Sequence, residues 1–323
     1  MMTDPHYFRI RGGANPHTRS AWGRRKRVDR GRSLKHWQQL AGTLRDAGVA
    51  VFVIPPNPAL PGMVYPANGG FLYRADEEIP ASEKTFYLSN LVPHRAREWR
   101  YYWRFVRGMG FGAANMPYRF EGEADFFPCG EDFLFFHGPV IDQHWALQSQ
   151  APFVRRVYGF RSDARNLHRL QEIVGPGTRI LSLTLVNEAH YHGDTVACSF
   201  GPRRQWLLLY ESALSRDSVA MLKNRLGDRI IALSDPDGGK FVANCYGART
   251  DSGYKLFLPH TASPEVLDRI KAKGVEPVRV NVSEFMEKGG GSIKCMVGDL
   301  GRIDFDERVT EEVRQFRQEH RYT

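Results

Sequence analysis

The chain has 323 residues, of which 42% are hydrophobic and 12% aromatic, and it carries a formal net charge of +9. This composition excludes an intrinsically disordered chain, because enough apolar side chain is present to bury a large core. The charge is concentrated at the start: residues 1–35 hold ten Lys and Arg against two Asp, and the remainder is close to neutral.

Apolar periodicity predicts helices that alternate with strands along the chain. Helices are expected to begin at capping residues such as Ser33 or the Ser263-Pro264 pair, and to end at glycines such as Gly48. The expected helices are 33–48, 213–226, 263–274 and 306–320, and the expected strands are 49–54, 179–186, 192–198, 205–210, 229–233 and 277–282. This alternation is typical of an α/β protein. Since no Pro/Ser-rich linker divides the chain, we expect a single domain over residues 1–323.

The four cysteines are widely spaced, with no CxxC pair to indicate a zinc site or a redox couple. No signal-peptide core opens the chain, and no apolar run approaches the ~18 residues of a membrane span. We therefore expect free thiols and a cytoplasmic protein with no membrane partner. The basic segment 9–35 could meet phosphates, but such runs are usually a solvated face, so a nucleic-acid partner is not favoured.

Near the C-terminus, three consecutive glycines, Gly289 to Gly291, lead through a short run to Cys295. Glycines let the backbone adopt positive φ and pass close to a ligand, which suits the mounting of a nucleophile. The alternative is a surface turn followed by a strand in which Cys295 is simply buried, as free cysteines often are.

Two earlier segments place polar side chains within apolar or glycine-rich runs. Asn68 precedes two glycines, although Asn-Gly is also the commonest tight-turn dipeptide. Glu121, Glu123 and Asp125 lie between phenylalanines, where a buried charge is costly unless it is paired or hydrogen-bonded.

A further segment contains His190, His192 and Asp194 at alternate positions, which would share one face of a strand. Such a face would suit a metal, so a metal hydrolase is one interpretation. A cysteine, a histidine and carboxylates in separate segments favour instead cysteine–histidine nucleophilic catalysis.

These segments resemble, in order, the motifs of the amidinotransferase or guanidine-modifying superfamily. Its members include arginine deiminases, dimethylarginine dimethylaminohydrolases, arginine dihydrolases and glycine amidinotransferases. The matching stretches are Val64-Tyr-Pro-Ala-Asn68-Gly-Gly70, Phe120-Glu-Gly-x-x-Asp125, Tyr191-His-Gly-Asp194-Thr and Gly289-Gly-Gly-Ser-Ile-Lys-Cys295. The resemblance implies an α/β-propeller of five ββαβ units around a pseudo-fivefold axis, with the active site in the central channel.

The resemblance also implies roles for single residues. Cys295 matches the nucleophile that attacks the guanidinium carbon to form a thiouronium-type intermediate, His192 matches the general acid/base, and Glu121 matches the carboxylate that orients this histidine. The expected substrate-binding residues are Asn68, Asp125, Asp194, Arg95, Arg161 and Asn15, with Arg97 or Arg165 as alternatives to the two arginines. No metal and no cofactor are expected.

The implied activity is hydrolysis of the guanidino group of arginine or a close derivative. Asn68 stands where many members carry aspartate, and an amide, which can both donate and accept, favours double hydrolysis to ornithine. Dimethylarginine hydrolysis and transfer of the amidino group to an amine are the alternatives within the superfamily. The non-enzyme alternative is a binding protein on the same fold that contacts nucleic acid through residues 9–35. Whether the protein forms a homo-oligomer is left open. Pro66 and Glu123 depart from the family pattern, so the exact substrate is also left open.

Overall fold

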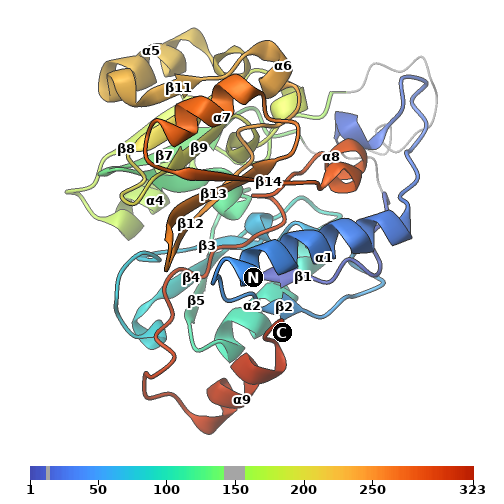
Figure 1. Ribbon diagram of the computed structural model, residues 1–323, viewed down its shortest axis with the longest axis vertical. Coiled ribbons are helices and arrows are strands. Elements are labelled where there is room, and N and C mark those ends of the chain that lie inside the picture. Colours follow the sequence, from blue (N-terminus) through green and yellow to red (C-terminus); the bar gives the residue numbers. More distant parts are fainter. Residues whose placement is uncertain (12–14, 142–156) are drawn as a thin grey trace.

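Four small sheets with the same internal order follow one another along the chain in the computed structural model, which describes residues 1–11, 15–141 and 157–323 (Figure 1). In each sheet the first two strands are antiparallel, and the third lies parallel to the second. The strands are β3 (Gly70–Leu72), β4 (Thr85–Leu88) and β5 (Gly112–Asn115); β6 (Phe126–Cys129), β7 (Asp132–His137) and β8 (Ile180–Thr184); β9 (Ala197–Phe200), β10 (Trp206–Leu209) and β11 (Ile230–Ala232); and β12 (Tyr246–Thr250), β13 (Gly253–Pro259) and β14 (Glu276–Val280). The helices that connect the parallel strands are α2 (Trp99–Gly108), α4 (Asn166–Val174), α5 (Arg216–Leu226) and α7 (Pro264–Lys271). Each sheet with its helix is a ββαβ unit.

A fifth unit is assembled from segments that are distant in the sequence. Strand β1 (Met2–Thr3) lies parallel to β2 (Val53–Ile54), and helix α1 (Arg30–Asp46) connects them. Gly298 takes the place of a first strand, because its N–H donates to the Met1 carbonyl at 2.9 Å and its carbonyl accepts from the Met1 nitrogen at 2.6 Å. The five units form the predicted α/β-propeller.

The predicted helices are confirmed, with corrections at their ends. Helix α1 begins before the predicted start at Ser33, because the Asp29 side chain accepts a hydrogen bond from the Arg32 N–H and so acts as the N-cap. Helix α7 begins as predicted, with Ser263 as N-cap and Pro264 in the first turn. The closing helix is α9 (Glu311–Glu319), and the short helices α6 (Asp235–Gly238) and α8 (Ser283–Gly289) complete the set described.

Two of the predicted strands are wrong in extent. In the apolar run 49–54 only Val53 and Ile54 form a strand. The predicted strand 192–198 is replaced by a turn over Gly193–Thr195, and the strand begins at Ala197. The turn forms because the Asp125 carboxylate accepts the Gly193 N–H, and the His192 carbonyl accepts the Thr195 hydroxyl, so local side-chain bonds replace the strand ladder.

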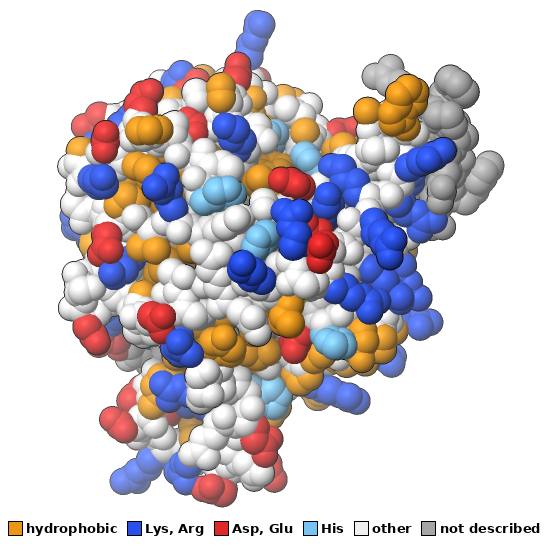
Figure 2. All heavy atoms as spheres, turned by 45° about the vertical axis from the view of Figure 1, so that its right-hand side comes forward, with side chains coloured by type: hydrophobic (Ala, Val, Ile, Leu, Met, Phe, Trp, Pro, Cys, Tyr) orange, Lys and Arg blue, Asp and Glu red, His pale blue; other side chains and the backbone are white. Residues whose placement is uncertain are grey.

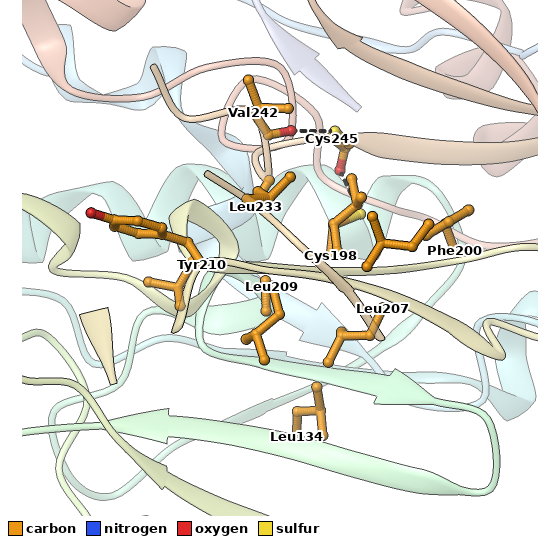
Figure 3. Close-up of a cluster of buried hydrophobic side chains, with 14 of the residues drawn as sticks. Leu134, Cys198, Phe200, Leu207, Leu209, Tyr210, Leu233, Val242 and Cys245 are labelled. Carbon is orange, nitrogen blue, oxygen red and sulfur yellow. Dashed lines mark hydrogen bonds between the residues drawn. The ribbon is translucent and has the colours of Figure 1, made fainter. Parts of the chain in front are cut away.

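The largest hydrophobic cluster of the described residues is formed by side chains of the second, third and fourth ββαβ units. Figure 3 shows Leu207 and Leu209 of β10 above Leu134 of β7. Cys198 and Cys245 lie in the same cluster, where the Cys198 thiol donates to the Cys245 carbonyl at 3.5 Å (Figure 3). All four cysteines are free, as predicted. Within the described residues, no helix is long and apolar enough to cross a membrane.

Candidate active site

The segment that precedes the first strand of each unit delivers one polar side chain to the centre of the ring. In chain order these side chains are Asn68, Glu121, His192, Asn244 and Cys295. A cavity of about 370 Å³ opens there, and its lining includes Asn15, Asn68, Arg95, Glu121, Arg161, His192 and Cys295. Residues predicted from well-separated parts of the sequence are therefore brought together.

The glycine run before Cys295 is buried, so the alternative of a surface turn is wrong. Gly290 has φ of +78°, the left-handed conformation that ends helix α8. A Cβ atom on Gly291 would lie 2.6 Å from the Tyr65 ring and 2.9 Å from the Cys295 Cβ atom. Only glycine permits this close approach, which places Cys295 at the cavity wall.

The Cys295 thiol is 3% exposed and lies between an acceptor and a donor. It donates to Asp194 Oδ2 at 3.2 Å, and it accepts from Asn244 Nδ2 at 3.2 Å. Burial raises the pKa of this thiol well above its usual value, and the neighbouring Asp194 raises it further. Burial also raises the pKa of Asp194 to about 7. In the free site the sulfur is therefore a thiol rather than a thiolate.

His192 and Glu121 form a buried pair beside the thiol segment. His192 Nε2 lies 2.8 Å from Glu121 Oε2. Burial alone would raise the pKa of Glu121, but the hydrogen bond and charge of His192, together with Arg95, lower it to about 2. Glu121 is thus an ionised carboxylate that can orient the imidazole.

Arg95 connects the first two segments. Its guanidinium makes a two-point contact with Glu98, donates to Asn68 Oδ1 at 2.9 Å, and lies 3.7 Å from Glu121 Oε2. Because Asn68 Oδ1 is held by Arg95, the amide nitrogen Nδ2 is left to face a ligand.

Three buried polar atoms around this site have no partner among the described residues: Asn68 Nδ2, Glu121 Oε1 and Asp194 Oδ1. Asn68 and Glu121 line the cavity, whereas Asp194 contacts the Cys295 sulfur and lines a second hollow together with Glu123 and Lys294. Leaving such atoms unpaired is costly, so their presence at and beside the cavity indicates a ligand that supplies the missing bonds. Two of the three are carboxylate oxygens, which accept hydrogen bonds. A planar guanidinium, with its five N–H donors, is a suitable partner for such acceptors.

Asp125, another predicted substrate residue, lies outside the cavity lining. Asp125 is fully buried, with Oδ1 accepting from the Gly193 N–H at 2.8 Å and Oδ2 from the Ser162 hydroxyl at 2.6 Å, and it does not line the cavity. Burial raises the pKa of Asp125 to about 7. Its contacts favour the positioning of the His192 segment over direct substrate contact.

Asn15 and Arg161 line the cavity and both contact Tyr191. Asn15 Nδ2 donates to the Tyr191 hydroxyl and to the Gly289 carbonyl, and Arg161 stacks over the Tyr191 ring at 4.8 Å. The alternative arginines, Arg97 and Arg165, are exposed and do not line the cavity.

The predicted metal face of His190, His192 and Asp194 does not form. Residues 188–190 and 193–195 are short helical turns, so the three side chains do not alternate as on a strand. His190 packs instead against Tyr210 and Phe241, with ring centroids 5.0 and 5.2 Å away. No group of three metal-binding side chains is found in the described part of the chain.

Asn244 was not predicted from the sequence, because the run Val242-Ala-Asn244-Cys carries no glycine and resembles an ordinary turn. A signal was nevertheless present. Ala67-Asn68 and Ala243-Asn244 both end two residues before the first strand of their units, which begin at Gly70 and Tyr246.

Described residues of the basic segment 9–35 line the cavity and a neighbouring hollow. Arg9 and Arg11 are part of the cavity lining, and a neighbouring hollow is lined by Arg9, Lys26, Arg27 and Arg30. Lys and Arg side chains gather on this side of the molecule in Figure 2. Binding of nucleic acid by this face remains a prediction, and it is not the favoured one.

The propeller has a cysteine and a His–Glu pair at its centre, and the chain is similar in sequence to known hydrolases that act on the C–N bonds of guanidino groups. The chain is 28% identical over 294 residues to N(G),N(G)-dimethylarginine dimethylaminohydrolase of Mycobacterium tuberculosis, a match that covers 91% of this chain and 83% of the relative. It is 24% identical over 321 residues to the bifunctional arginine dihydrolase/ornithine cyclodeaminase AgrE of Nostoc, of which it spans 38%. No family model matches the chain.

Solved structures show the same fold. The N-terminal domain of ArgZ, an arginine dihydrolase from the ornithine-ammonia cycle in cyanobacteria, superposes with a TM-score of 0.75 at 20% identity, covering 94% of this chain and 97% of that domain. This chain covers 41% of full-length ArgZ. A dimethylarginine dimethylaminohydrolase adduct with S-methyl-L-thiocitrulline superposes with a TM-score of 0.63 at 14% identity.

Proposed function

We propose that this protein hydrolyses the guanidino group of arginine or a close derivative through a covalent adduct on Cys295. The observation that carries the proposal is the set of unpaired buried acceptors, Glu121 Oε1 and Asp194 Oδ1, beside a buried free thiol. Guanidinium N–H groups would satisfy both oxygens and hold the guanidinium carbon near the sulfur.

The bound cation would also activate the nucleophile. In the free site Asp194 favours the protonated thiol, and a guanidinium next to Asp194 offsets that negative charge. The S–H proton passes to Asp194 Oδ2, its hydrogen-bond acceptor, the resulting thiolate attacks the guanidinium carbon, and the leaving amine takes a proton from His192. Water, deprotonated by the same imidazole, attacks the adduct and releases the sulfur. Glu121 keeps the ring oriented in both steps.

For the product, the structure supports double hydrolysis through Asn68. After the first cycle the substrate end is a ureido group, whose carbonyl oxygen needs a donor. Asn68 Nδ2 is a donor without a partner in the described residues, and Arg95 holds the Oδ1 side of the amide. We therefore infer that a ureido intermediate can be held for a second attack, which gives ornithine, ammonia and carbon dioxide.

Asn68→Asp is expected to stop the reaction after the first hydrolysis. A carboxylate accepts hydrogen bonds but cannot donate one to the ureido oxygen, so citrulline should accumulate and ornithine should fall by roughly 10-fold or more relative to citrulline. Mass spectrometry of the products from arginine measures this ratio. An unchanged ratio would remove Asn68 from the second step.

The function itself is tested by product analysis on a panel of guanidino compounds with the purified protein. Ornithine with ammonia supports the proposal, and citrulline with ammonia indicates a deiminase. Citrulline with methylamines indicates a dimethylarginine hydrolase, a second candidate that the 28% identity to the mycobacterial enzyme favours. Transfer to glycine would indicate an amidinotransferase. No turnover, with salt-sensitive binding of RNA or DNA, would favour the binding protein.

Asp194→Asn is expected to have opposite effects on thiol reactivity and on turnover. Removal of the carboxylate charge lowers the pKa of the Cys295 thiol, so its alkylation by iodoacetamide at neutral pH should become several-fold faster. Turnover should nevertheless fall, because an acceptor for the guanidinium is lost. Peptide mass spectrometry after timed alkylation gives the first rate. Slower alkylation in the variant would show that Asp194 does not hold the thiol protonated.

A further inference from the structure

The fourth unit contributes a residue that the proposed chemistry has not yet used. Four of the five central segments supply the expected site residues, and the segment before β12 supplies Asn244, which is fully buried. Its position matches that of Asn68 in the first unit, since each asparagine precedes the first strand of its unit by two residues. We propose that Asn244 is the hydrogen-bond donor that stabilises the Cys295 thiolate and fixes the direction of the sulfur. This inference deepens the proposed function and rests on it.

The orientation of the Asn244 amide is determined by its own contacts. Its oxygen Oδ1 accepts two backbone N–H groups, from Ser292 at 3.1 Å and from Cys295 at 3.2 Å. A flipped amide would direct N–H groups at two other N–H groups, so the nitrogen must occupy the opposite position. Oδ1 therefore ties the Asn244 side chain to the backbone of the nucleophile segment.

The nitrogen side of the amide faces the reactive group. Nδ2 donates to the Cys295 sulfur at 3.2 Å and to the Asp194 carbonyl at 3.1 Å. Both hydrogens of Nδ2 are thereby used on the segments that carry the thiol and its carboxylate neighbour. One amide thus locks the His192–Asp194 turn, the Cys295 segment and the sulfur in a single arrangement.

Two neighbours of the Cys295 sulfur have opposite effects on its protonation. Asp194 Oδ2 accepts the S–H proton and favours the thiol, whereas Asn244 Nδ2 donates to the sulfur and favours the thiolate. A donor of this kind acts whether or not a guanidinium cation is bound. It would therefore assist both when the thiol ionises before the attack and when the thiolate leaves the adduct at the end of each hydrolysis.

The test is the alkylation rate of Cys295 in Asn244 variants between pH 6 and pH 10, followed by peptide mass spectrometry and compared with kcat and KM. Asn244→Ala should slow alkylation at neutral pH by roughly 10- to 100-fold, the effect expected for a lost hydrogen bond to a charged group. Asn244→Ser, which restores a hydroxyl donor, should recover part of the rate. Asn244→Asp, nearly isosteric but without the donor, should alkylate more slowly than Asn244→Ala, because it adds a negative charge. In each variant kcat should fall more than KM changes.

Asn166→Ala is the matched control. Asn166 is equally buried and donates to the Arg119 and Asp163 carbonyls, away from the cavity, so its loss should leave the alkylation profile of Cys295 unchanged. If Asn244→Ala does not fold, the Asn244→Asp and Asn244→Ser profiles decide the question. A wild-type alkylation profile in Asn244→Asp would overturn the inference. Alkylation needs no substrate, so this outcome is distinct from failure of the proposed function, which full turnover in Cys295→Ser would reveal.

Discussion

Cys295→Ser is expected to lower turnover of the guanidino substrate by roughly 10⁴- to 10⁶-fold, the range seen when the nucleophile of a catalytic set is removed. The hydroxyl can still donate to Asp194 Oδ2 and accept from Asn244 Nδ2, so the contacts of the segment persist. Ionisation of the nucleophile is lost, because a serine hydroxyl is far less acidic than a thiol. Substrate binding should be retained, and turnover by mass spectrometry together with binding by calorimetry measures both.

Cys129→Ser is the control for this substitution. Cys129 is buried in the second unit and does not line the cavity, and burial raises the pKa of its thiol to about 12. The variant should keep wild-type kcat while losing some stability. Substantial activity in Cys295→Ser, with correct folding by circular dichroism, would disprove the covalent mechanism.

The parts of the site that could be predicted from the sequence are those with unusual local chemistry. Cys295 follows a glycine run, His192 and Asp194 flank a glycine, and Glu121 stands before one, because these segments must turn sharply toward the ring centre. Gly122 illustrates the requirement: it has φ of +63°, and a Cβ atom there would lie 2.4 Å from the Gly70 carbonyl oxygen.

Other features depend on contacts between units and were not predictable from local sequence. Asn244 is functional only because the fourth unit packs against the fifth, where its amide meets the backbone of Ser292 and Cys295. The wrong strand at 192–198 has the same origin, since the alternating pattern gave no sign that Asp125 would bind the Gly193 N–H. Long-range hydrogen bonds overrode the local strand preference.

His192→Asn is expected to lower kcat by roughly 10²- to 10⁴-fold, the usual contribution of a general acid/base. The asparagine amide takes the place of Nδ1 rather than Nε2, so the bond to Glu121 Oε2 is lost, and the amide cannot deliver a proton to the leaving amine or remove one from water. The adduct on Cys295 should therefore persist longer than in the wild type. Rapid-quench mass spectrometry of the intact protein would detect it as an added mass.

His190→Asn tests whether His192 acts in proton transfer or, together with His190, as a metal ligand. His190 is two positions away and buried to the same 3% exposure, but its ring packs on Tyr210 and Phe241 and does not line the cavity. Under the covalent mechanism its loss should cost stability and far less activity than His192→Asn. If both variants lost activity equally, and exhaustive chelation inactivated the wild type, a metal hydrolase would have to replace the covalent mechanism. If activity survives chelation and depends on His192 much more than on His190, His192 acts in proton transfer. This role fits its pairing with Glu121.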